Sequence, residues 1–251
     1  MKYDWNSKNN ATNIIDGLDE IMNMNFKTYN INPSFPEMLT ELYKDSVSPE
    51  ETSIRKDFRG EKVLTIDCEE CKDMDDAVSV VKTNDGYRLA VHIADVSAYV
   101  KFGSNIDAVA ESRATSIYLP HRTIPMLPQY LSNGLCSLNP GVDRYTLSVI
   151  MHINRQGKVI RSQITKGLIR SRVKGVYSEI NHILSGDKNS DLIKKYDEVL
   201  EELYVMRALY KILRKERISR GSVIEDNATT KILLSEQDVK LIRSKAGEAE
   251  K

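Results

Sequence analysis

An acidic stretch of ten residues holds the side chains best suited to do chemistry in this chain. Residues 67–76 contain six carboxylates, and Lys72 is the only basic residue among them. Four of the six are aspartates with the spacing D-x5-D-x-D-D, at Asp67, Asp73, Asp75 and Asp76. Carboxylate oxygens at this density suit a hard divalent cation, and one or two such ions could act on a phosphate group.

The segments on either side give a reason for these carboxylates to stay together. Apolar and β-branched runs at 63–66 and 77–81 predict two strands, so the acidic residues lie where one strand ends and the next begins. Two carboxylates about 4 Å apart repel by roughly 4 kcal/mol at an effective dielectric constant near 20. A turn that holds several of them indicates a bound cation, which we expect to be Mg²⁺ or else Mn²⁺.

Two other interpretations of the same stretch stay open. A run of charged residues is often a solvated turn with no ligand. Cys68 and Cys71 have the spacing of half a zinc site or of a redox pair, with Cys136 as the only further cysteine. A calcium-binding EF-hand loop is excluded, because its required glycine and glutamate positions hold Lys72 and Val78.

The bulk composition describes a globular chain without net charge. Of 251 residues 41% are hydrophobic, and 36 Lys and Arg balance 36 Asp and Glu, so net charge favours neither a nucleic-acid nor a membrane partner. Basic residues nevertheless concentrate in 155–174 and 207–220. The N-terminus lacks a signal-peptide core, and no run of about 18 apolar residues occurs, so we expect a reduced, cytoplasmic protein without membrane contact.

The predicted elements place the acidic stretch in a mixed α+β fold with a largely antiparallel sheet and flanking helices. Alternating patterns and turn residues predict strands at 63–66, 77–82 and 87–93, a long hairpin over 146–153 and 158–169, and a weak strand at 231–234. Helical spacing and capping residues predict helices at 12–22, 36–45, 105–113 and 191–214.

Several motifs together resemble the ribonuclease II and ribonuclease R family. The four aspartates follow a Thr-Ile-Asp strand end and have the same spacing as in the family. Further stretches resemble the family in the same order, at 89–97, 113–120, 124–128 and 131–144. The resemblance spans about residues 55–225. It implies the N-terminal part of an RNB-type catalytic domain at 55–251, after a helical and linker segment at 1–54.

Members of that family are hydrolytic exoribonucleases that degrade single-stranded RNA from the 3′ end with magnesium and release 5′-mononucleotides. Carried over by position, the resemblance implies metal ligation by Asp67, Asp75 and Asp76. It also implies that hydrolysis depends most on Asp75, while Asp73 supports the metal or the 3′-terminal nucleotide. An aromatic ring that stacks on a base and basic groups that follow the phosphates would bind substrate, at Tyr118, Arg113, Arg170 and Arg172. His92 and Asp95 also match, and we interpret them as structural residues of the strand meander.

Two departures from the family bear on activity. Residues 222–225 lack the aromatic residue that the family places against the tyrosine, and Glu225 stands there instead. The chain also ends before a later segment that supplies a glutamate and an arginine near the scissile phosphate, which would weaken transition-state electrostatics. The alternative is therefore a weak or inactive relative that binds RNA or a partner, such as a second half-domain or a second copy. A magnesium phosphoesterase for small molecules is a more distant alternative.

Overall fold

The computed structural model describes residues 14–36, 39, 47–186, 190–223 and 228–250. Contacts divide them into two compact units. The smaller unit holds two helices and two strand pairs: α1 (Ile14–Thr28), α3 (Asn105–Arg113), β5 (Ile117–Tyr118) with β6 (Thr123–Ile124), and β10 (Ala228–Leu234) with β11 (Val239–Lys245). Most of the helix predicted at 36–45, and the position of Glu225, lie outside the described residues. The predicted division after residue 54 stays a prediction.

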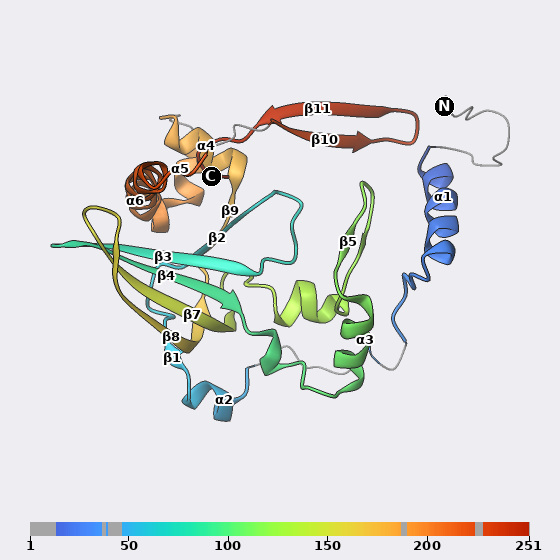
Figure 1. Ribbon diagram of the computed structural model, residues 1–251, viewed down its shortest axis with the longest axis horizontal. Helices are drawn as coiled ribbons and strands as arrows, with labels where there is room; N and C mark the ends of the chain where they lie inside the picture. Colours follow the sequence, from blue (N-terminus) through green and yellow to red (C-terminus); the bar gives the residue numbers. More distant parts are fainter. Residues whose placement is uncertain (1–13, 37–38, 40–46, 187–189, 224–227, 251) are drawn as a thin grey trace. The chain divides into compact units, whose positions relative to one another are not determined.

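The larger unit is built on a seven-stranded sheet (Figure 1). Its strands are, in spatial order, β1 (Lys56–Asp57), β8 (Val159–Arg170), β7 (Asp143–Asn154), β4 (Gly86–Ala94), β3 (Asp76–Thr83), β2 (Leu64–Asp67) and β9 (Val173–Val176). The inner pairs from β8 to β2 are antiparallel, whereas the edge strands β1 and β9 pair in parallel. The predicted mixed α+β class with a largely antiparallel sheet is confirmed.

The hairpins form where turn residues predict them. Asn84 and Asp85 join β3 to β4, which begins at Gly86, and β7 and β8 form the long second hairpin. Gly86 has a φ of 154°, and a Cβ there would lie 2.0 Å from the Ile153 carbonyl oxygen. Only glycine therefore allows β4 to begin this close to β7.

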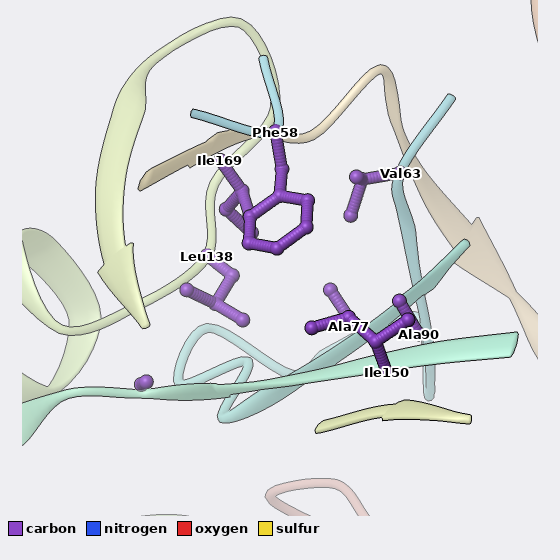
Figure 2. Close-up of a cluster of buried hydrophobic side chains, with 8 residues drawn as sticks. Phe58, Val63, Ala77, Ala90, Leu138, Ile150 and Ile169 are labelled. Carbon is purple, nitrogen blue, oxygen red and sulfur yellow. The ribbon is translucent and has the colours of Figure 1, made fainter. Parts of the chain in front are cut away.

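Apolar side chains cover both faces of the sheet. On one face Phe58 packs over residues of β3, β4, β7 and β8 (Figure 2), in the cluster Phe58, Val63, Ala77, Ala90, Ala94, Leu138, Ile150 and Ile169. The other face carries α4 (Tyr177–Leu184) and α6 (Leu200–Ser219), which bury Ile180, Leu203 and Leu209. Each buried side chain of this size contributes about 1.5–3 kcal/mol. The ends of β2 and β3, which carry the acidic stretch, therefore start from a well-packed sheet.

The helix predicted at 191–214 is interrupted, so that prediction was wrong in this respect. The structure has α5 (Ser190–Lys195), the 3-10 turn η4 (Asp197–Val199) and then α6. Tyr196 stands at the break with 1% of its surface exposed. Its hydroxyl donates to Glu179 and accepts a hydrogen bond from the Val176 N–H. These contacts draw Tyr196 into the core and end the first helix there.

Other short elements complete the chain. The larger unit also has α2 (Pro49–Ser53), the 3-10 turn η2 (Val96–Ala98) and the π-helix η3 (Tyr130–Leu135). In the smaller unit α3 begins as predicted, because Ser104 Oγ accepts a hydrogen bond of 3.2 Å from the Asp107 N–H. None of the helices in the described ranges is long and apolar enough to cross a bilayer.

Candidate functional site

The four aspartates lie in one connection between neighbouring strands. Asp67 is the last residue of β2, and Asp76 is the first residue of β3, which pairs with β2 in antiparallel fashion. Asp73 and Asp75 belong to the segment between them. The structure therefore confirms the predicted position of the acidic stretch between two strand ends, and we call residues 67–76 the acidic turn.

Backbone hydrogen bonds hold the acidic turn at its centre. The Met74 side chain is 2% exposed, so this residue anchors the segment between Asp73 and Asp75. Its N–H donates to Ser137 Oγ at 3.1 Å, and its carbonyl accepts from the Leu138 N–H at 2.9 Å. The carbonyl of Asp75 accepts from the Ala94 N–H at 2.8 Å. These bonds fix the backbone between Asp73 and Asp75, so the two carboxylates cannot move apart through a backbone rearrangement.

Two positioning residues were missed by sequence reasoning. Ser137 Oγ donates to the Lys72 carbonyl at 2.8 Å, so one buried hydroxyl joins both sides of Asp73. Lys174 on β9 donates from Nζ to the carbonyls of Glu69 and Cys71, at 2.8 and 2.5 Å. Ser137 falls inside the family-like stretch 131–144, which was the available signal. Lys174 had no signal beyond its place in a basic run.

Burial and neighbouring negative charge raise the pKa of two aspartates of the acidic turn, Asp67 and Asp75. Burial, followed by the negative charge of Asp76, raises the pKa of Asp67 above its ordinary value, and the charge of Lys174 opposes this. Burial and the charges of Asp73 and Asp76 likewise raise the pKa of Asp75. Asp67 Oδ2 is buried and has no hydrogen-bond partner among the described residues. At Asp67 the acidic turn thus holds negative charge that its described neighbours balance only in part.

The Cys71 thiol is part of the same arrangement. It lies 3.5 Å from Asp73 Oδ1 and 3.8 Å from Asp67 Oδ1, within reach of a thiol hydrogen bond to either. Burial and the charge of Asp67 raise the pKa of this thiol to about 12. Cys71 therefore lies where its thiol can form a hydrogen bond to these aspartates. The interpretations of Cys68 and Cys71 as half a zinc site or a redox pair stay predictions.

The residues of the acidic turn fit a hard divalent cation by their chemistry. They offer carboxylate oxygens, a buried Asp67 Oδ2 that lacks a partner, and raised carboxyl pKa values that a positive charge would lower. Within the described ranges, no three His, Cys, Asp or Glu side chains are already close enough to hold a metal ion together. The fold therefore gathers the candidate ligands without arranging them as a finished coordination shell.

The predicted substrate-binding residues Arg170 and Arg172 form hydrogen bonds within the protein. Arg170 donates from Nε to Asp143 at 2.8 Å, and Arg59 binds the same carboxylate group at 3.0 Å. Arg172 donates from Nη2 to the Arg59 carbonyl at 2.9 Å. Arg170 and Arg172 thus stabilise the strand ends, and their role in substrate binding stays a prediction.

Arg113 and Tyr118 belong to the smaller unit. Arg113 donates to the carbonyls of Pro125 and Ser34 at 3.1 and 2.7 Å, and its guanidinium lies 3.8 Å from the centre of the Phe35 ring. Tyr118 ends the short strand β5 with 66% of its surface exposed, as a base-stacking ring requires. Their substrate contacts stay predictions.

His92 and Asp95 have the structural role that we assigned to them. His92 is fully buried and shares hydrogen bonds with Ser148 Oγ at 2.8 Å and Ser79 Oγ at 3.5 Å. Asp95 accepts from Arg55 and from Ser97, each at 2.6 Å. Both residues join strands or turns around the meander.

Comparison with known sequences agrees with this geometry. Residues 55–251 match the family model described as the RNB domain. The chain belongs to the RNB-domain family. This RNB chain is 44% identical to ribonuclease R of Thermotoga maritima over 201 residues, which cover 78% of the chain and 28% of that protein. Ribonuclease R of Escherichia coli K12 is 38% identical over 193 residues, covering 76% and 24%. The RNB chain spans less than a third of the length of these curated relatives.

Solved structures show the same fold. The apo form of Mycoplasma genitalium RNase R superimposes with a TM-score of 0.83 and 28% identity, over 95% of this chain and 37% of that one. The same enzyme in complex with ribose-methylated single-stranded RNA gives a TM-score of 0.80, over 90% and 36%. The sheet and its acidic turn are therefore part of an RNB-type fold.

Proposed function

We propose that this RNB chain is a magnesium-dependent hydrolytic 3′-to-5′ exoribonuclease, or its metal-bearing portion, which degrades single-stranded RNA to 5′-mononucleotides in the cytoplasm. The observation that carries the proposal is the acidic turn, which holds Asp67, Asp73, Asp75 and Asp76 between two strands and buries Asp67 Oδ2 without a hydrogen-bond partner among the described residues. The family membership and the RNA complex of the Mycoplasma genitalium relative support RNA as the substrate.

Three of the four aspartates would share one role in the proposed reaction, and the fourth would have another. Asp67, Asp75 and Asp76 would hold Mg²⁺, with Mn²⁺ as a substitute, because carboxylate oxygens on fixed strand ends suit these ions. When bound, the ions would polarise a phosphoryl oxygen and neutralise charge on the leaving oxygen. Asp75 lies next to the buried Met74 anchor, so its carboxylate keeps a defined position beside Asp73. Asp73 would orient the terminal nucleotide or support the ions.

The direct test is release of mononucleotides from single-stranded RNA. A 5′-labelled oligoribonucleotide is incubated with the unaltered chain and Mg²⁺, beside Asp75→Asn and the control Asp85→Asn. Asp85 is an exposed carboxylate in the β3–β4 turn, so its substitution changes net charge equally outside the acidic turn. We expect stepwise shortening from the 3′ end by the unaltered chain and Asp85→Asn, and a loss of at least about 100-fold for Asp75→Asn. No shortening of the labelled strand by the unaltered chain would refute the proposal for this chain.

A second candidate function is RNA or partner binding without turnover. It is favoured by the lack, in the described part of the chain, of three ligand side chains already placed to hold a metal. The partner would be a second half-domain or a second copy of this chain. Gel-shift and light-scattering measurements separate the two functions: salt-sensitive RNA binding or self-association without turnover supports this candidate, and neither at low salt contradicts it.

A further inference from the structure

A small basic cavity lies on the sheet face that also carries Phe58. It has a volume of about 120 Å³, and its wall includes Lys56, Arg88, His152, Arg161 and Gln163, with Ile150 among its lining residues. Ile150 is 4% exposed and belongs to the apolar cluster of this face (Figure 2). The cavity therefore combines an apolar base with a wall of positive and neutral donors.

Strand register brings these side chains together. Arg88 on β4 stands opposite His152 on β7, and His152 stands opposite Arg161 on β8, so the three form one row across adjacent strands. The next row on the same face pairs Ile150 with Gln163. Side chains two residues apart on a strand share a face, so both rows open to the same side. The position of the cavity is thus set by the backbone pairing.

The positive charges in this cavity are only partly balanced. Arg88 donates two hydrogen bonds to the Glu61 carboxylate, at 3.0 and 2.7 Å, which neutralises its charge. Lys56 and Arg161 have no carboxylate partner among the described residues, and the Lys56 ammonium instead lies 5.2 Å from the centre of the Phe58 ring. Like charges gathered on one sheet face are unfavourable unless an anion lies between them. The arrangement thus favours an anionic ligand.

The cavity volume limits the ligand to a small group. Pockets for whole nucleotides or drug-sized molecules hold about 300–1,000 Å³, whereas this cavity holds about 120 Å³. A single phosphate group fits the volume, the charge and the donor set. Guanidinium and amide groups are suited to its oxygens, and the guanidinium can bind two of them at once.

We infer that this cavity binds one phosphate group of an RNA strand, with Arg161 as the main contact and Lys56 as the second. The choice of RNA as the source of the phosphate rests on the proposed function. Arg161 carries this role in place of Arg170, whose guanidinium is already bound by Asp143. The contact is to the backbone of the strand and is independent of base sequence.

The test is the salt dependence of RNA binding, measured by fluorescence anisotropy of a labelled oligouridylate in EDTA, where turnover does not interfere. For single strands the slope of log K against log salt is about −0.7 per neutralised phosphate. We expect Arg161→Gln and Lys56→Gln each to reduce the magnitude of the slope by up to about 0.7. Arg161→Lys preserves the positive charge, so its slope should stay close to that of the unaltered chain.

The matched control is Lys158→Gln, which removes an exposed cation at the turn before β8 and outside the cavity. Its slope should equal that of the unaltered chain. Equal slope changes in all three glutamine variants would show a diffuse basic surface and overturn the inference, as would an unchanged slope for Arg161→Gln. Circular dichroism melting confirms that each variant is folded, which is expected because Lys56, Lys158 and Arg161 are exposed.

Two further arms separate the possible outcomes. A titration with inorganic phosphate, followed by the ³¹P line width, tests free phosphate as the ligand. If phosphate binding depends on Arg161 but the salt slope of RNA binding does not, the assignment to RNA is overturned. Mononucleotide release is measured separately in Mg²⁺. If Arg161→Gln lowers the magnitude of the salt slope but the unaltered chain releases no mononucleotides, this inference is supported and only the proposed exonuclease is refuted. If the unaltered chain releases mononucleotides but Arg161→Gln leaves the slope unchanged, only this inference is refuted.

Discussion

Charged side chains meet at two places in the larger unit with opposite results. At Arg55, whose side chain is fully buried, the guanidinium donates to Asp95 at 2.6 Å and to the Thr146 carbonyl at 3.1 Å. In the acidic turn, Asp67 keeps a buried oxygen without a partner in the described structure, and Asp76 adds a like charge. The charge of Arg55 is paired within the protein, and this pairing stabilises the fold. The acidic turn keeps an unpaired acceptor at Asp67, as a site for a ligand must.

The largest effect should come from breaking the pairing of Arg55. Arg55→Met leaves Asp95, which is 8% exposed, without its cation, and we expect a loss of about 3–5 kcal/mol in the free energy of unfolding. Urea denaturation measures this. The control is Arg170→Met at the exposed pair with Asp143, where the loss should stay below about 1 kcal/mol. Equal losses would show that the buried pair has no special role.

His92 is another buried polar group with hydrogen-bond partners inside the protein, and it should make the stability depend on pH. Burial lowers the pKa of His92 to about 4, against the influence of the Glu61 carboxylate. Between pH 6.5 and 4 the unfolded chain binds a proton that the folded chain refuses, so stability falls as pH falls through this range. The expected contribution is roughly 3 kcal/mol. Denaturation midpoints from pH 7 to 4 should show it, and His92→Gln should remove this part of the slope. An identical slope in the variant would contradict the assignment.

A smaller loss of stability is expected at Ser137, a buried residue that holds the acidic turn. Ser137→Ala removes the hydroxyl that bonds the Met74 N–H and the Lys72 carbonyl. We expect a loss of about 1–3 kcal/mol in the free energy of unfolding, because the Met74 N–H would be left buried without its partner. The control Ser185→Ala, at an exposed helix end, should cost less than about 1 kcal/mol. Weaker Mg²⁺ binding by Ser137→Ala alone would show that the hydroxyl also positions the acidic turn. Unchanged stability would mean that Ser137 does not hold it.

The smallest effect has the opposite sign. Asp67→Asn relieves the repulsion from Asp76, so in EDTA at pH 7 the variant should be more stable than the unaltered chain, by less than about 1 kcal/mol. Because folding raises the pKa of Asp67, this gain should shrink as pH falls towards ordinary carboxyl values. Addition of Mg²⁺ should stabilise only the unaltered chain. A variant that is less stable in EDTA would contradict an uncompensated charge.

The local features of the site were predictable, and its long-range contacts were not. The flanking strands and the D-x5-D-x-D-D spacing lie within residues 63–81, where alternation and turn chemistry act directly. Ser137 and Lys174 hold the turn from 63 and 105 residues away in sequence, and no periodic pattern encodes such a contact. Tyr196 shows the same limit, because its helical spacing is overridden by the hydrogen bonds that bury it.

The most direct test of the acidic turn as a metal centre is Mn²⁺ binding, followed by the loss of the electron paramagnetic resonance signal of the free ion. The chain is compared with Asp67→Asn/Asp76→Asn and with Asp85→Asn. We expect one or two bound ions in the unaltered chain and in Asp85→Asn, and none at the same concentration in the double variant. Equal Mn²⁺ binding by all three proteins would contradict the assignment of the acidic turn as the metal site.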